Sequence, residues 1–379
     1  MHRVLNYGSA LQAYALQTTM EKLGHACNLI DYQYPYVDSG SNSLPQRLLT
    51  FLNKWVRRLL RLCSDPQGIF HGRIRRNAFI RFYRERYKLT SYYRSHEELS
   101  TNPPSFDLYV TGSDQVWNYN YMKGDSVFFC DFIQNGAPRI AYSASFAISD
   151  ISGVYAKTYG ELLRKYTAIG VREKGAVDIV RNLSQKEAIA VCDPSLLLSV
   201  SDYSVLSKRS TIRVHEPYLL VYILDYQFNP HPLIEDIIDR ISTERHLRVV
   251  YLCGAAPWRK VRNAVVIDQA GPNEFVYLFK HASFVVTSSF HGVAFSLLFK
   301  RQVYGVVEST EDTDRAGSLF RMVGAESNAI PATSTIDSFI ESEIDYTAVS
   351  PLLEQYKKRS LDFLRESITS CESLVSRSE

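Results

Sequence analysis

Four short stretches of this chain place polar residues directly after apolar runs that have the composition of β-strands. The stretch 285–296, VVTSSFHGVAFS, ends its apolar run in Ser288 and Ser289 and continues to His291. Imidazole is the side chain best suited to move protons near neutral pH. Taken alone, the two serines would as often be only the N-cap of a helix, and the histidine would more often be buried and packed. The stretch by itself leaves proton transfer and packing open.

The other three stretches are NYGSALQ (6–12), VTGSDQVWN (110–118) and GVREKGA (170–176), and they supply Asn6, Gln12, Asp114, Gln115 and Arg172. In parallel sheets, ligands bind beyond the carboxyl ends of the strands, which is where these residues would lie. The simpler interpretations are a capping aspartate in a turn and an arginine paired with the next glutamate at the surface.

Strands alternate with helices along most of the chain, which predicts parallel sheets. A first helix is expected over 8–24 and a short strand over 25–34. Two alternating blocks follow, separated by the polar stretch 199–216, which is the best candidate for a linker. We therefore predict an α/β fold with two Rossmann-like lobes that face a cleft, residues 1–205 and 206–379, the second ending in a long helix.

Positive charge is concentrated in residues 46–88, which hold twelve Lys and Arg against two Asp and Glu. This segment carries +10, so the rest of the chain carries −7 of the total of +3. It is predicted to be a basic helical insertion with an apolar face. It would either pack on its lobe as an ordinary surface helix or rest on an anionic membrane. No nucleic-acid-binding motif accompanies the charge.

The remaining composition excludes several classes of site. The six cysteines are scattered singly without nearby histidines, so neither a disulfide framework nor a metal site is predicted. No apolar run approaches the roughly 18 residues of a membrane-spanning helix, and the start lacks a secretory signal. A cytoplasmic protein is expected. It would either be free in the cytoplasm or contact the inner face of the membrane peripherally through residues 46–88.

Six motifs occur in an order that resembles the polysaccharide pyruvyl transferase family, from Asn6 to about Gly324: NYGSALQAYALQ, YVTGSDQVWN, IAYSASF, VREKGA, CDPSLLL and TSSFHGVAFSLLFK. The resemblance implies a two-lobed fold like that of GT-B glycosyltransferases. It further implies transfer of a pyruvyl group from phosphoenolpyruvate to a saccharide or lipid-linked glycan as a ketal, in cell-surface or exopolysaccharide biosynthesis. Phosphoenolpyruvate would be a co-substrate, and no bound cofactor or metal is expected.

Carried over by position, the resemblance assigns proton transfer to His291 and makes Arg172 a leading site residue. By analogy with GT-B enzymes, Asp114 would contact the acceptor sugar or assist as a base. Other branches of the family keep an arginine two positions before the histidine, where this chain has Ser289. The missing cation would be replaced by Arg315 or, less well, by Lys300. The expected donor-binding residues are thus Arg172, Ser288, Ser289, Arg315 and Lys300, and the expected acceptor-binding residues are Asn6, Gln12 and Gln115.

The residues before Asn6 depart from the family, whose members usually have an apolar strand there, whereas this chain offers MHRVL. Two other functions also stay open. One is a glycosyltransferase of the same two-lobed form that uses a nucleotide sugar, although no acidic ribose ligand is evident in the second lobe. The other is a non-catalytic, glycan-binding relative that kept the fold.

Overall fold

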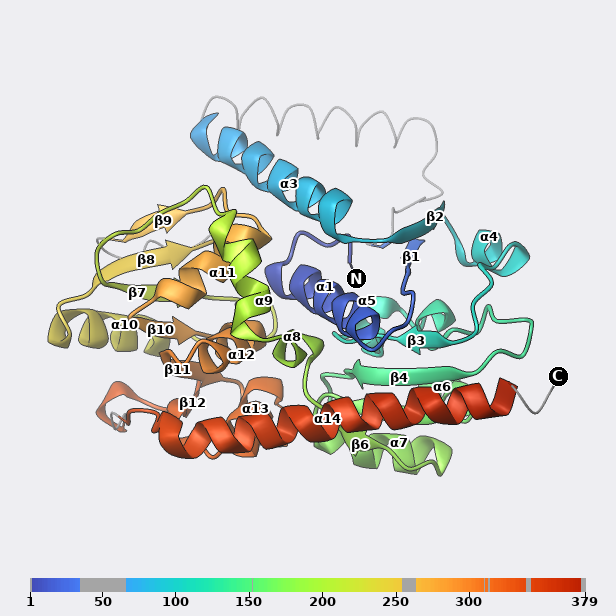
Figure 1. Ribbon diagram of the computed structural model, residues 1–379. Helices are drawn as coiled ribbons and strands as arrows, with labels where there is room; N and C mark the ends of the chain where they lie inside the picture. Colours follow the sequence, from blue (N-terminus) through green and yellow to red (C-terminus); the bar gives the residue numbers. More distant parts are fainter. Residues whose placement is uncertain are drawn as a thin grey trace, which may run out of the picture.

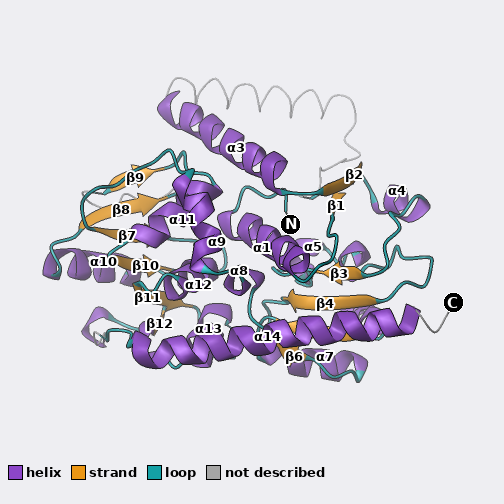
Figure 2. Ribbon diagram, in the orientation of Figure 1, coloured by secondary structure: helices purple, strands orange, loops and turns teal. Residues whose placement is uncertain are grey.

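The computed structural model describes residues 2–34, 66–151, 153–253, 264–309, 311–312, 314–338 and 342–375. They form two α/β lobes, each built on a parallel sheet, which lie side by side in Figure 1 and are coloured by secondary structure in Figure 2. The predicted α/β fold with two Rossmann-like lobes is confirmed.

The N-terminal lobe is built on a parallel sheet of order β3-β4-β5-β6. All six residues of β4 are buried, as expected of a central strand with helices on both faces. The elements of this sheet and its connections are β3 (Tyr109–Thr111), α5 (Tyr119–Met122), η1 (Ser126–Phe129), β4 (Arg139–Ala144), α6 (Val154–Leu163), β5 (Ala168–Val171), α7 (Gly175–Ser184), β6 (Ile189–Ala190) and α8 (Pro194–Leu197).

A second, two-stranded sheet in this lobe consists of β1 (Leu29–Tyr32) and β2 (Leu89–Tyr93), which run parallel and are followed by α4 (His96–Thr101). The strand expected over 25–34 is therefore present and shorter than predicted. Residues 2–5 form turns and bends rather than a strand. They are held in place by Asp31 of β1, whose carboxylate pairs with Arg3 and lies 3.2 Å from the His2 ring.

The C-terminal lobe has a six-stranded parallel sheet of order β12-β11-β10-β7-β8-β9. In this doubly wound order, strands β7, β8 and β9 extend the sheet to one side. From β10, which lies on the other side of β7, the sheet then extends in the opposite direction. Its elements are β7 (Tyr218–Tyr222), α10 (Leu233–Glu244), β8 (Arg248–Leu252), β9 (Val265–Ile267), α11 (Pro272–His281), β10 (Phe284–Thr287), α12 (Phe290–Leu298), β11 (Gln302–Val307), α13 (Arg315–Met322), η2 (Glu326–Asn328), β12 (Ala329–Pro331) and η3 (Ile336–Ser338).

Helix α1 (Tyr7–Lys22) lies between the lobes and is buried along most of its length (Figure 1). It ends as predicted before Gly24, which has a φ of +95° that favours glycine. Tyr7 and Leu11 belong to the core of the C-terminal lobe. Leu16 and Met20, further along the same helix, pack with β4 of the N-terminal lobe.

Helix α14 (Tyr346–Val375) returns from the C-terminal lobe to the N-terminal lobe (Figure 1). Val349 and Leu353 near its start pack in the C-terminal core, whereas Leu364 and Ile368 pack against β4. The stretch 199–216, predicted as a linker, is not extended throughout. Ser199 caps a regular helix, α9 (Val200–Lys208), which packs on α11.

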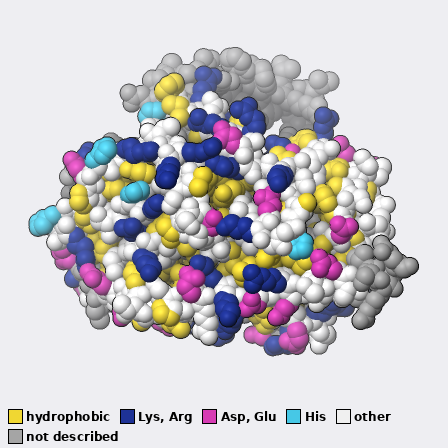
Figure 3. All heavy atoms as spheres, in the orientation of Figure 1, with side chains coloured by type: hydrophobic (Ala, Val, Ile, Leu, Met, Phe, Trp, Pro, Cys, Tyr) yellow, Lys and Arg dark blue, Asp and Glu magenta, His cyan; other side chains and the backbone are white. Residues whose placement is uncertain are grey.

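The basic segment is described only in part, because residues 46–65 lie outside the described residues. Its second half is helical, as predicted: α3 (Pro66–Arg86) buries Phe79 and Phe82 against α1 and α11 and exposes most of its arginines. Figure 3 shows Lys and Arg side chains beside α3 interspersed with hydrophobic and acidic ones. Among the described helices, none combines the length and apolarity needed to cross a bilayer. Membrane contact stays a prediction.

Candidate functional site

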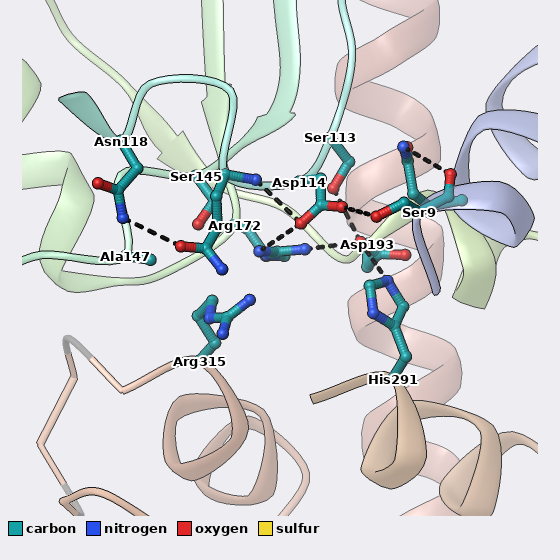
Figure 4. Close-up of polar contacts among 12 residues, drawn as sticks. Ser9, Ser113, Asp114, Asn118, Ser145, Ala147, Arg172, Asp193, His291 and Arg315 are labelled. Atoms are coloured by element: carbon teal, nitrogen blue, oxygen red, sulfur yellow. Dashed lines mark hydrogen bonds and ion pairs between the residues drawn. The ribbon is translucent and has the colours of Figure 1, made fainter. Parts of the chain in front are cut away.

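Polar side chains from both lobes converge where the carboxyl ends of the strands face one another (Figure 4). In the N-terminal lobe they follow β3, β4, β5 and β6, and in the C-terminal lobe they follow β10 and β11. The β10 end lies beside β7, at the point where the strand order reverses. Doubly wound sheets bind their ligands at this reversal, so the fold itself singles out the segment that contains His291.

His291 stands in the first turn of α12, and its ring is buried. Its Nε2 atom lies 3.7 Å from Oδ2 of Asp193 and makes no hydrogen bond with any described residue. The ring packs against the backbone of Gly8, where an added Cβ would lie 2.0 Å from Nδ1. A buried ring nitrogen without a hydrogen-bond partner is unusual and is available to a ligand.

Arg172 follows β5 and is almost fully buried. One Nη atom donates to Asp193 Oδ2 at 3.2 Å, and the other lies 3.7 Å from Asp114 Oδ1. The guanidinium also stacks over the Phe290 ring at 4.6 Å. Its Nε and Nη2 atoms make no hydrogen bond with any described residue. Two such donors on a fixed, planar cation can bind a carboxylate or phosphate.

Asp193 connects these two residues and was not among the residues that we predicted. It is the N-cap of α8 and accepts hydrogen bonds from Ser195 and from Ser113 Oγ, the latter at 2.8 Å. Burial would raise the pKa of this carboxyl, but nearby His291 and Arg172 outweigh burial and hold the pKa well below its usual range. The motif CDPSLLL contained the signal, since an aspartate before a proline is typical of a helix start.

Asp114 lies at the carboxyl end of β3 with a φ of +80°, which is rare for a residue other than glycine. One carboxylate oxygen accepts from Ser9 Oγ of α1 at 2.5 Å, and the other faces Arg172. Burial acts to raise its pKa, whereas Arg172 and His291 lower the pKa below its usual range and prevail. Asp114 is therefore a carboxylate at neutral pH.

Glu173 fixes the neighbouring loop after β4. Its carboxylate accepts a hydrogen bond from Ser145 Oγ and another from the Ala147 amide at 3.2 Å. The simpler interpretation of a surface pair with Arg172 is wrong, because both residues are buried and Glu173 bonds to this loop instead. With Asp114 and Asp193 it brings three carboxylates against the two guanidinium groups of Arg172 and Arg315. One net negative charge remains while His291 is neutral.

Arg315, the first residue of α13, enters the site from the C-terminal lobe and points toward Arg172 (Figure 4). It donates to Gln227 Oε1, and Gln227 in turn donates to Gln115 Oε1 at 3.2 Å. The same Gln115 oxygen accepts from Asn118 at 3.0 Å. This series of amides joins the two lobes at the edge of the site.

The structure does not bring every predicted residue to this cluster. Lys300 is exposed beyond the C-terminal end of α12, and His291 is at its N-terminal end, about 13 Å along the axis. The structure therefore does not bring Lys300, a predicted donor-binding residue, to this cluster. Ser288 Oγ is bonded to the backbone of Leu224 in both directions, at 2.8 Å, and joins the ends of β7 and β10. Ser289 caps α12 through the Gly292 amide.

Two predicted acceptor residues have structural partners in α1. Asn6 is the N-cap of the helix and accepts from the Ser9 amide at 3.1 Å. Gln12 is buried and donates to the Ser9 carbonyl. Within the described ranges, no three His, Cys, Asp or Glu side chains are placed to hold a metal ion.

The model of the polysaccharide pyruvyl transferase family matches residues 6–310, which is most of the chain and includes nearly every residue of this cluster. The chain belongs to the polysaccharide pyruvyl transferase family. It is accordingly a transferase of glycan biosynthesis, with a pyruvyl donor and a saccharide acceptor. The converging residues His291, Arg172 and Asp114 are the candidates for the active site of this pyruvyl transferase, and Arg315 lies just beyond the matched residues.

Three solved structures are similar to this pyruvyl transferase at low sequence identity. UDP-GlcNAc 2-epimerase from Neisseria meningitidis, bound to UDP-GlcNAc, is 13% identical over 79% of this chain and 89% of that chain, with a TM-score of 0.47. The UDP-GlcNAc 2-epimerase from Methanocaldococcus jannaschii is 12% identical over 73% and 82%, with a TM-score of 0.44. A glycotransferase of kitacinnamycin is 11% identical over 82% of each chain, with a TM-score of 0.36. No curated protein matches the chain in sequence.

Proposed function

We propose that this protein transfers the pyruvyl group of phosphoenolpyruvate to two hydroxyls of a saccharide and forms a pyruvate ketal. The observation that carries the proposal is the convergence of Arg172 Nε and Nη2 and His291 Nε2 in one buried cluster. These three atoms make no hydrogen bond with any described residue, and Nη2 and Nε2 lie 3.7 Å from the carboxylates of Asp114 and Asp193. A donor with a carboxylate, a phosphate and a protonatable enol carbon needs cationic donors and a proton-transferring group side by side.

The reaction balances with the groups at hand. Protonation of the donor methylene carbon gives a methyl group and leaves the adjacent carbon open to attack. One acceptor hydroxyl adds to that carbon and a second displaces phosphate, so two C–O bonds to the sugar form as the bond to phosphate breaks. Of the two hydroxyl protons released, one replaces the proton used on carbon and one leaves with phosphate. His291 is the residue that we assign to the transfer to carbon, and Asp114 assists at the hydroxyls.

The anionic groups of the donor would be held by the cations of this cluster. Arg172 would hold the carboxylate or phosphate through its two unbonded donors, and Arg315 would exchange its bond to Gln227 for a bond to the donor. The N-terminus of α12 adds the positive end of a helix dipole at the same place.

The acceptor would enter beside Gln115, from the N-terminal side of the site. Gln115 already forms hydrogen bonds with Gln227 and Asn118, and such side-chain amides can exchange these partners for sugar hydroxyls. Asp114 adjoins it and faces Arg172. Asn6 and Gln12 have their own partners in α1, so Gln115 is the acceptor residue on which we place most weight.

The test is to incubate the purified protein with phosphoenolpyruvate and a panel of glycans and to follow inorganic phosphate and the mass of the acceptor. We expect equal amounts of phosphate and pyruvylated glycan. His291→Ala should lower the rate by about 10²-fold or more, as loss of a general acid–base does. Arg172→Lys should raise KM for the donor, because lysine keeps the charge and loses the forked geometry.

The matched control is Lys358→Ala, an exposed cation on α14, which should leave the rate unchanged. Full activity of His291→Ala would refute the assigned role even if the reaction is right. Glycosyl transfer from a nucleotide sugar, without turnover of phosphoenolpyruvate, would favour the glycosyltransferase alternative. Glycan binding without either reaction would favour a non-catalytic relative.

A further inference from the structure

Two exposed tyrosines flank the series of amides that joins the two lobes. Tyr226, in the loop after β7 of the C-terminal lobe, is 54% exposed. Tyr121, in α5 of the N-terminal lobe, is 37% exposed. A single exposed aromatic residue needs no explanation. A pair beside the candidate active site, one from each lobe, calls for one, because the residues that we assign to the reaction make no use of either ring.

Hydrogen bonds place the two tyrosines near each other. Gln227, the residue after Tyr226, donates to Gln115 Oε1 at 3.2 Å. The same oxygen accepts from the Asn118 side chain at 3.0 Å, and the Asn118 carbonyl accepts from the Tyr121 amide at 3.1 Å. The backbones of the two tyrosines are thus connected across the boundary between the lobes by three amide side chains.

Electrostatic interactions place Tyr226 beside Asp114 and Tyr121. Burial raises the pKa of the Tyr226 hydroxyl above its usual value, and nearby Arg315 acts against this rise. Asp114 and Tyr121 are also near enough to raise this pKa further. Tyr34, which follows β1, has its pKa raised by burial and then by the same aspartate and both other tyrosines. Asp114 and the three tyrosines therefore share one neighbourhood at the edge of the site.

Tyr226 lines a hollow rather than a convex surface. More than half of its surface is accessible to solvent, yet burial is the main cause of the rise in its pKa. A residue has both properties when protein surrounds it on several sides and leaves one side open. Asp114 and Gln115 are each only 5% exposed, so they lie deeper than the tyrosine. The exposed rings therefore stand at the entrance, and the buried polar groups lie beyond it.

We propose that Tyr121 and Tyr226 form an acceptor subsite in which their rings pack against the C–H face of a pyranose unit. This inference rests on the proposed function, because it takes the glycan to enter beside Gln115. A face of a pyranose ring presents a row of C–H groups, whereas most of its hydroxyls point outward from the ring edge. The C–H groups pack on the electron-rich face of an aromatic ring, and the hydroxyls are left to bond with amides such as that of Gln115.

The position of Gln227 connects this subsite to the donor. Its side chain donates to Gln115 and accepts from Arg315, the cation that we assign to the donor. A sugar that packs on Tyr226 thus lies next to the group that would hold phosphoenolpyruvate. An acceptor hydroxyl has to meet the pyruvyl carbon at this place. The subsite also takes one ring from each lobe, so binding of the sugar depends on how the two lobes are arranged.

The test measures glycan binding without phosphoenolpyruvate, by titration followed with saturation-transfer-difference NMR. The probes are methyl β-galactoside, methyl β-glucoside, lactose and N-acetyllactosamine. The wild type should bind at least one probe and transfer most saturation to the C–H protons of one ring face. Tyr226→Ala should weaken this binding about two- to tenfold, the contribution of one aromatic contact, whereas Tyr226→Phe should keep it. Tyr92→Ala, at a tyrosine of β2 that is 39% exposed, is the matched control and should bind as the wild type does.

Equal affinity of the wild type and Tyr226→Ala would overturn the inference, and so would failure of the wild type to bind any of the four probes. The proposed reaction can fail separately. Binding that depends on Tyr226, without ketal formation when phosphoenolpyruvate is added, would support the subsite and refute the proposed function. Pyruvyl transfer by Tyr226→Ala with an unchanged KM for the acceptor would refute the subsite alone.

Discussion

At the scale of single residues, Asp193 determines how the site is assembled. It lies 3.2 Å from Arg172 and 3.7 Å from His291, so one carboxylate orients a cation of the N-terminal lobe and a ring of the C-terminal lobe. Its further bonds to Ser113 and Ser195 leave it little freedom to move. We regard it as a positioning residue, since its oxygens are occupied by protein groups.

Asp193→Asn should lower kcat/KM by about 10²-fold, as loss of a group that orients a catalytic histidine does. Asp193→Glu, which keeps the carboxylate, should recover part of the lost rate, whereas a purely structural role would leave the two variants equally impaired. The measurement is kcat and KM with phosphoenolpyruvate, and Asp178→Asn, an exposed aspartate paired with Arg181, is the control.

The same substitution has a stability consequence whose sign follows from the lowered pKa of Asp193. A carboxyl whose pKa is lower in the folded than in the unfolded protein stabilises the folded state at pH values above its unfolded pKa of about 3.9. This contribution is lost as the pH falls further. The variant should therefore be less stable than the wild type at pH 6, by about 3 kcal/mol for an uncompensated buried charge. The difference should shrink below pH 4, which urea unfolding at both pH values would show.

At the scale of elements, the site depends on how closely α1 approaches α12. Gly8 allows this approach, because an added Cβ would lie 2.0 Å from the His291 ring. Gly8→Ala should displace the ring and lower kcat by about tenfold or more with little change in KM for the acceptor. Gly72→Ala in α3 is the matched control, since a Cβ added at Gly72 would meet no neighbouring group within 4 Å. It should stabilise that helix by about 0.5–1 kcal/mol and leave activity unchanged.

Sequence patterns predicted the elements better than the contacts between them. The parallel strands could be predicted because buried strands are local apolar runs. Arg172 and His291 could be predicted as site residues because each lies within a few residues of the end of such a run. Asp193 could not be assigned a role, since its partners Arg172 and His291 are 21 and 98 positions away along the chain. Helix α9 was missed although Ser199 and Asp202 form a capping box, a signal that the polar composition obscured.

At the scale of the whole molecule, the two lobes share helices, and the boundary predicted at 205 cuts through shared cores. Tyr7 and Leu11 are fully buried in the core of the C-terminal lobe, and the Tyr7 hydroxyl donates to the Cys253 carbonyl at 3.1 Å. Leu364 of α14 is fully buried against the N-terminal sheet. Each lobe therefore completes its core with a helix from the other side of the boundary.

We expect that the fragments 1–205 and 206–379 do not fold alone, whereas the whole chain unfolds in one transition. Losing a buried side chain of this size costs about 2–5 kcal/mol, and an entire domain is stable by only about 5–15 kcal/mol. Near-ultraviolet circular dichroism during thermal unfolding checks this for each fragment and for their mixture. The mixture should regain the signal, because the shared cores re-form on association. A cooperative transition of the fragment 206–379 alone would show that α1 is dispensable to that lobe.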